Sequence, residues 1–177
     1  MDFQDLCAAR RSIRRFSPES PTEEEVRALL RAALLGPSSK NRRDWNFIVT
    51  RDREIIDALS GAKEGGAAFL EGAPCVIAVV GTPSRNDCWV EDCSVAAASI
   101  LYQAQDLGLG ACWVQFRGRG KVDPQTGGTI LCDDFLRKLF SLDEEQRVLC
   151  AVAVGYPLTP KPPKQLEDED WEKVRYL

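Results

Sequence analysis

The sequence predicts an α+β fold, a sandwich in which helices flank a small central mixed β-sheet. Apolar, valine-rich runs at residues 73–81 and 148–155 are typical of buried strands. Elsewhere apolar residues recur at helical spacing, most clearly from Val26 to Leu34. Strands and helices alternate too irregularly for a doubly wound parallel sheet. The 177 residues, 44% of them hydrophobic and 28% charged, suit a single domain over residues 1–177 with one sizeable core.

Helix start and stop signals define the N-terminal half. Thr22 and Glu25 form a capping-box pattern, and Gly36 followed by Pro37 stops the helix that begins there. The expected elements are, in order, a helix at 2–9, the helix after Thr22, a polar loop at 37–41, a strand at 45–50, a helix at 52–59, a short helical segment after the Gly65-Gly66 bend, and a strand at 73–81.

The C-terminal half begins with a long, alanine-rich helix over residues 92–107, which Gly108 and Gly110 are expected to end. The elements after it are a strand at 111–116, a glycine-rich loop at 117–128, a helix that includes 135–140, a turn at 142–145 and a strand at 148–155. The tail at 157–177 is too aromatic for a disordered end and has no obvious place in the chain's own core. We therefore expect it to pack on a partner subunit.

Composition excludes several classes of function. A net charge of −4 and a pI of about 5.0 argue against nucleic-acid binding, which needs a broad basic face. The longest apolar run, residues 76–80, is too short to cross a bilayer, and the N-terminus lacks an apolar signal region. We therefore expect a cytoplasmic protein with no membrane association.

The chain contains no histidine, which removes histidine-dependent nucleophilic systems and the usual proton shuttle at neutral pH. Its seven cysteines form no Cys-x-x-Cys pair and predict no disulfide framework. Cys75, Cys112 and Cys150 lie in apolar runs and are expected in the core, while Cys88 and Cys93 lack the further ligands that a metal site needs. The chemistry is therefore expected from a cofactor, with no side chain assigned as catalytic.

Residues 10–16, Arg-Arg-Ser-Ile-Arg-Arg-Phe, place four guanidinium groups and a hydroxyl in a short stretch of an acidic chain. Guanidinium groups grip phosphate through paired hydrogen bonds, so the segment predicts an anion site. Two further local basic clusters, at 40–43 and 161–164, fit one bound phosphate better than a polymer. Solvated surface charge remains the alternative for each cluster.

Four motifs then carry a resemblance. They are residues 10–16, the Pro-Ser-Ser-x-Asn loop at 37–41 followed by Trp45-x-Phe47, the Gly-Leu-Gly-x-Cys-Trp motif at 108–113, and Gly155-Tyr156-Pro157 with lysines beyond. In this order they resemble the nitroreductase family of flavin enzymes, from about residue 7 to the C-terminus, and above all its short members.

The resemblance implies a homodimer that holds FMN in two clefts at the subunit interface. It implies that NADH or NADPH reduces the flavin and that a small electrophile (a nitroaromatic, a quinone or an activated alkene) reoxidises it in a ping-pong cycle. By the same resemblance, the FMN phosphate and ribityl region are bound by Arg10, Arg11, Ser12 and Arg14, with Lys161 and Lys164 returning to the phosphate. The flavin ring is approached by Pro37, Ser38, Ser39 and Asn41 of the other subunit, and lies against the strand that contains Trp113, Val114 and Gln115.

Other interpretations stay open. Ser38 and Ser39 could simply shape a loop, Trp113 could be plain core, and Lys161 and Lys164 could be solvated. The alternative function is a flavin-binding storage or regulatory protein with little NAD(P)H turnover. Two departures from the family pattern favour it: residues 65–68 carry no asparagine for the flavin's pyrimidine edge, and the region between Gly81 and Asp92 is too short for the helical cover of larger members. A third departure is Arg43-Asp44, which replaces a frequent Gln-Pro.

Overall fold

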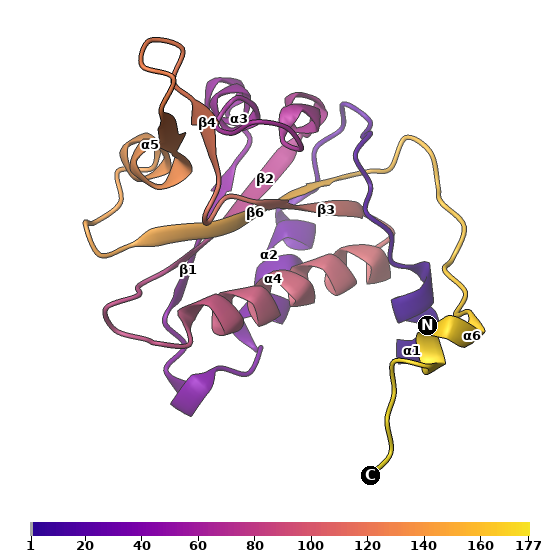
Figure 1. Ribbon diagram of the computed structural model, residues 1–177. Helices are drawn as coiled ribbons and strands as arrows, with labels where there is room; N and C mark the ends of the chain where they lie inside the picture. The colour runs from indigo at the N-terminus through magenta and orange to yellow at the C-terminus, as the bar shows by residue number, and fades with distance from the viewer. Residues whose placement is uncertain (1) are drawn as a thin grey trace.

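A computed structural model describes residues 2–177, with the side chains of all of these except Asp168 and Glu169 (Figure 1). The helices are α1 (Phe3–Ala9), α2 (Glu23–Leu34), α3 (Arg53–Ser60), α4 (Trp89–Asp106), α5 (Cys132–Leu139) and α6 (Asp168–Trp171), with 3₁₀ turns η1 (Ser39–Asn41) and η2 (Ala68–Gly72). The strands are β1 (Trp45–Thr50), β2 (Cys75–Gly81), β3 (Gly110–Gln115), β4 (Gly120–Val122), β5 (Thr129–Leu131) and β6 (Arg147–Gly155).

The central sheet has four strands in the order β1-β2-β6-β3. The predicted α+β class is confirmed, but the prediction of a mixed sheet is wrong, because all three strand pairs are antiparallel. The end of β1 at Thr50 lies opposite Val76 near the start of β2, so the helical connection between them returns to the same end of the sheet. An intervening helix therefore does not require a parallel crossover.

Helices cover both faces of the sheet (Figure 1). α2 and α4 pack on one face, and α3, η2 and α5 lie on the other. Every residue of β2 is buried, as is every residue of β6 after Arg147. The two faces hold two apolar clusters, one built around Leu29, Ile77 and Ile100 and one around Ile56, Val76 and Leu136. The predicted core cysteines Cys75, Cys112 and Cys150 are all buried.

Three predicted boundaries change. α4 begins at Trp89, three residues before the predicted start, and α5 spans Cys132–Leu139 around the predicted 135–140. The region predicted as a loop at 117–128 contains β4, which pairs with β5 in a separate hairpin. A turn closes this hairpin, in which the Asp123 N–H donates to the Gly128 carbonyl at 2.7 Å. The glycines and proline of the turn hide the short strands, because the same residues are typical of open loops.

No helix within residues 2–177 is both long enough and apolar enough to cross a membrane.

The arginine segment is held to the sheet by its two apolar residues. Ile13 and Phe16 are only 7% and 8% exposed, whereas Arg14 and Arg15 point outward. The Ile13 N–H donates to the Ala111 carbonyl at 3.0 Å, next to a parallel bridge between Ser12 and Ala111. The segment therefore lies along the outer edge of β3.

Gly110 makes this close approach possible. A Cβ at position 110 would lie 2.7 Å from Ile13 Cγ2 and 2.8 Å from Ile13 Cβ. A β-branched side chain has little freedom to move away, so any larger residue at 110 pushes the arginine segment off the sheet.

We predict that Gly110→Ala lowers the free energy of unfolding by about 1–3 kcal/mol through overpacking against Ile13. Urea denaturation followed by circular dichroism measures the change. Gly72→Ala is the control, because a Cβ there meets nothing within 4 Å. Equal stability of the two variants would contradict the close contact.

Candidate functional site

A compact group of cations surrounds the start of β3. Burial raises the pKa of the Cys112 thiol, while the charge of Arg14, a hydrogen bond with Ser12, and the charges of Lys161 and Arg10 act in the opposite direction. These four groups therefore lie near the Cys112 thiol. Arg14 also lies over the ring of Phe69 in η2, with the guanidinium carbon 5.7 Å from the ring centre.

The first part of the C-terminal tail joins this group. The Lys161 ammonium donates to the Ser12 carbonyl at 3.0 Å, and the Arg11 guanidinium donates to the Pro162 carbonyl. Arg11 and Lys161 also line a cavity of about 280 Å³ at the C-terminal end of α4, together with Gly108. The tail thus binds its own chain up to Lys164, mainly through polar groups that apolar patterning does not reveal.

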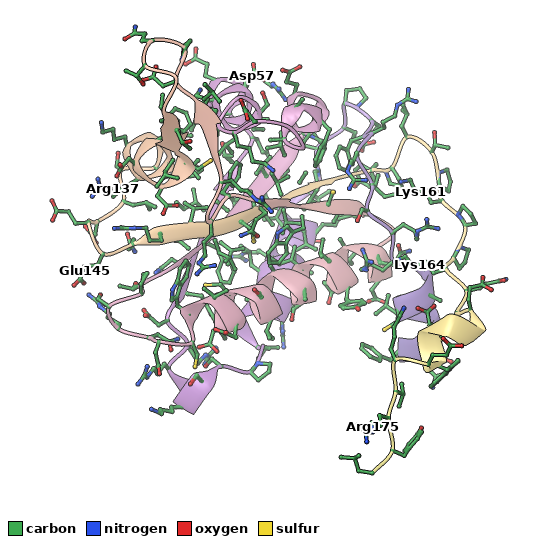
Figure 2. The ribbon with its side chains drawn as sticks, in the orientation of Figure 1. Asp57, Arg137, Glu145, Lys161, Lys164 and Arg175 are labelled. Carbon is green, nitrogen blue, oxygen red and sulfur yellow. The ribbon has the colours of Figure 1, made fainter. Side chains whose placement is uncertain are left out.

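Lys164 occupies a different place. Its backbone N–H donates to the Ala8 carbonyl at 2.8 Å, and its side chain lines a cavity of about 610 Å³ with Cys7 and Trp171. Figure 2 shows Lys164 on the part of the tail beside α1, and Lys161 earlier along the same tail. The two lysines predicted for one site therefore lie against different surroundings.

β3 presents alternate backbone groups to the outer edge of the sheet. Because the Ala111 carbonyl faces the arginine segment, the backbone groups of Trp113 and Gln115 face the same outer edge, and those of Val114 face β6. The Trp113 indole is half-buried against the α4 side and donates to Gln115 Oε1 at 3.0 Å. Trp113 is thus partly core, and its backbone and that of Gln115 are the groups available at the edge.

The loop at 37–41 lies elsewhere in the same chain. The Ser39 N–H donates to Asp92 Oδ1 at 2.8 Å, so the loop is at the N-terminal end of α4. The arginine segment is near the other end of α4, a helix of 18 residues that is about 27 Å long. Figure 1 shows η1 and α1 at opposite ends of this helix. One chain therefore does not bring Pro37, Ser38, Ser39 and Asn41 to the arginines.

The sequence interpretation did not identify several residues that lie near the cations and the 37–41 loop. Phe69 faces Arg14, and Trp89 packs under Arg117, with 5.7 Å from guanidinium carbon to ring centre. Asn86 and Asp92 are buried beneath the 37–41 loop. Only Asp92 carried a signal, as an acidic residue near a helix start, and that signal is common to many surface helices.

A model of the Nitroreductase family matches residues 7–67 and 60–156. This chain belongs to the nitroreductase family. The match covers the arginine segment, the 37–41 loop, β3 and the Gly155-Tyr156 motif in their predicted order. The family resemblance drawn from the four motifs is thereby confirmed.

Known members of the nitroreductase family agree in sequence and in fold. The chain is 34% identical over 173 residues to an NADH dehydrogenase/NAD(P)H nitroreductase, so named, of Methanothermobacter thermautotrophicus, covering 96% of this chain and 85% of that protein. It is 36% identical, with a TM-score of 0.90 over 98% of both chains, to an FMN-dependent nitroreductase of Clostridium difficile. A nitroreductase of Desulfovibrio desulfuricans, solved in complex with FMN, shares the fold at 22% identity, with a TM-score of 0.76 over 98% of this chain and 96% of that one.

Proposed function

We propose that this chain is an FMN-dependent oxidoreductase that transfers hydride from NAD(P)H to a small electrophile. The observation that carries the proposal is the gathering of Arg10, Arg14 and Lys161 near Cys112 at the start of an edge strand, with the Lys161 ammonium 3.0 Å from the carbonyl oxygen of Ser12. The family membership supports the oxidoreductase activity, and relatives named as NAD(P)H and FMN-dependent nitroreductases support the cofactors.

The donor set suits the phosphate of FMN. A phosphate dianion needs two or more cations together with hydroxyl or backbone donors, and this group supplies guanidinium, ammonium and hydroxyl groups. The Cys112 thiol beneath them stays protonated because burial raises its pKa, so it adds no negative charge that would repel the phosphate. Arg10, Ser12, Arg14 and Lys161 would hold the phosphate, while Arg11 braces the tail at Pro162.

The outer edge of β3 suits a planar ring. Beyond the bridge at Ala111, the structure of residues 2–177 shows no further strand paired with this edge. The backbone groups of Trp113 and Gln115 can therefore donate to and accept from the polar rim of the flavin. FMN, when bound, supplies the hydride chemistry, which explains how an enzyme of this kind can lack histidine.

A second copy of the chain would complete the site. Since the 37–41 loop and the arginines lie toward opposite ends of α4, that loop would reach the flavin from the other subunit of a homodimer. A groove of about 550 Å³ along α1, α2 and α4 offers an apolar surface for such a partner, lined by Phe3, Ala32 and Val95. Phe3 and Val95, which line this groove, are 69% and 38% exposed.

The end of the tail offers further apolar surface. The sequence predicted that the whole tail, 157–177, packs on the partner, but its first part, 157–164, hydrogen-bonds to its own chain. Trp171 and Tyr176 are 60% and 89% exposed, so the candidate for a segment that clasps the partner is reduced to residues 165–177. The single-domain organisation over 1–177 and the cytoplasmic location both stay predictions.

The proposed function is tested by the absorbance spectrum of the purified protein and by anaerobic titration with NADH and with NADPH. We expect a flavin spectrum that bleaches with one or both nucleotides and recovers when a quinone or nitroaromatic is added. Bound FMN that is reduced no faster than free FMN would instead identify a storage or regulatory flavoprotein. Absence of FMN binding at micromolar flavin excess would refute the proposal.

We predict that Arg14→Ala weakens FMN binding by about 1.5–3 kcal/mol, the scale of a hydrogen bond to a charged group. This corresponds to a rise in Kd of roughly 10- to 150-fold, measurable by flavin fluorescence. Arg15→Ala is the matched control, because Arg15 is the exposed neighbour whose charge does not act on Cys112 in the same group. Equal effects of both substitutions would place the phosphate elsewhere.

We also predict that the two tail lysines differ. Lys161→Ala should raise the Kd of FMN by about tenfold, since it removes a cation beside Ser12, whereas Lys164→Ala should change it less than about twofold. Isothermal titration with FMN, and with riboflavin as the ligand without phosphate, separates the phosphate contact from ring binding. A larger effect of Lys164→Ala would show that the tail rearranges when flavin binds.

A further inference from the structure

Two buried polar side chains lie under the 37–41 loop. Asp92 is 5% exposed and Asn86 is 1% exposed. Both carboxylate oxygens of Asp92 are used: Oδ1 accepts the Ser39 N–H at 2.8 Å, and Oδ2 accepts the Asn86 amide at 2.7 Å. A buried carboxylate is stable only when such partners replace the water it has lost.

The second side chain extends this network to the surface. Asn86 Oδ1 accepts the Cys88 N–H at 3.0 Å and the Arg42 guanidinium at 3.2 Å. The same guanidinium donates to the Arg85 carbonyl and pairs with Asp87 at 3.1 Å. The Asp92–Asn86 pair therefore holds the loop at two points, the backbone N–H of Ser39 and the guanidinium of Arg42.

The loop between these two points has an unfavourable backbone conformation. Lys40, Asn41 and Arg43 have φ of 52°, 53° and 53°, the left-handed region that non-glycine residues seldom adopt. Such a conformation persists where the surrounding structure enforces it. The Arg43 N–H donates to Ser38 Oγ at 3.0 Å and closes the loop on itself. The contacts to the body of the protein are made by the Ser39 backbone and by the guanidinium groups of Arg42 and Arg43, the last of which donates to the Leu34 carbonyl at the end of α2 at 2.5 Å.

We propose that the Asp92–Asn86 pair is a positioning device that holds residues 38–43 in the shape needed to contact the flavin ring of the partner subunit. This inference rests on the proposed function. In this role Asp92 and Asn86 would act on the flavin indirectly, through the backbone of Ser39 and through Arg42.

The donor and acceptor roles of Asp92 and Asn86 suggest a substitution that disrupts their hydrogen bond with little change in side-chain size. In Asp92→Asn the new side chain keeps one acceptor for the Ser39 N–H and turns an NH₂ group toward the NH₂ group of Asn86. Asn86 cannot turn over to relieve this clash of donors, because its oxygen already serves Cys88 and Arg42. The exchange Asn86→Asp with Asp92→Asn satisfies every partner again, with the roles of the two side chains reversed.

The test measures FMN binding and the visible circular dichroism of the bound flavin, which reports the surroundings of the ring. We expect Asp92→Asn to raise the Kd of FMN by about tenfold and to change the visible spectrum. The double exchange should return both toward the native values. Glu91→Gln is the control, since it removes one charge from an exposed site in the same helical turn.

A mixed dimer separates positioning from general destabilisation. One subunit carries Arg14→Ala and the other Asp92→Asn, with different affinity tags. If Asp92 acts on the flavin held by the other subunit, both lesions fall in one site and the second site is intact. We then expect half of the sites to bind FMN with native affinity. Two equally weakened sites would overturn the proposal.

The wild-type control distinguishes failure of the positioning role from failure of the proposed function. If the wild-type protein does not bind FMN, the proposed function fails. If the wild type binds FMN and Asp92→Asn matches it in both affinity and spectrum, the positioning role fails. If the Asp92→Asn variant does not fold, Arg42→Ala is the substitute, because it removes the hydrogen bond between the loop and Asn86 at an exposed residue. A native flavin spectrum in that variant would refute the proposal as well.

Discussion

Burial of the two central strands on both faces is the constraint on which the rest of this structure depends. Every residue of β2 and nearly every residue of β6 is removed from water, so helices must cover each face of the sheet. On one face the covering helices are α2 and the longer α4, which packs on the sheet and has 18 residues. The arginine segment and the 37–41 loop flank its two ends, and this separation is why the proposed flavin site needs two chains.

The anion site itself depends on apolar packing. Ile13 and Phe16 enter the core and hold the backbone between them against the edge of β3. This backbone packing positions the arginines of residues 10–15 at the edge of the sheet, so their placement does not depend on ion pairs. Burial raises the pKa of the nearby Cys112 thiol and keeps it protonated, so this group does not offset the positive charges around it. A bound phosphate would relieve the mutual repulsion of these cations, which suits a site that is completed by its ligand.

The two ends of α4 use different physical means to present their groups. At the C-terminal end, hydrophobic anchors and the tight approach at Gly110 fix the arginine segment. At the N-terminal end, a buried carboxylate and amide fix a loop whose backbone is left-handed at three non-glycine residues. The second arrangement is more sensitive to substitution, because loss of one partner leaves a buried polar group unsatisfied as well as releasing the loop.

The sequence by itself determined the class of fold, the order of the main elements and the family. These follow from local signals: the Thr22–Glu25 capping box, the valine-rich strands, the Gly108 stop and four motifs in a fixed order. Only the tertiary structure decided the antiparallel sheet, the β4–β5 hairpin, the separate places of Lys161 and Lys164, and the buried Asp92–Asn86 pair. These depend on which distant segments meet, and neither periodicity nor spacing along one chain reports such encounters. Asp92 begins a helix in the sequence as many acidic residues do, and it becomes a support for a loop only because Ser39, 53 positions away, folds onto it.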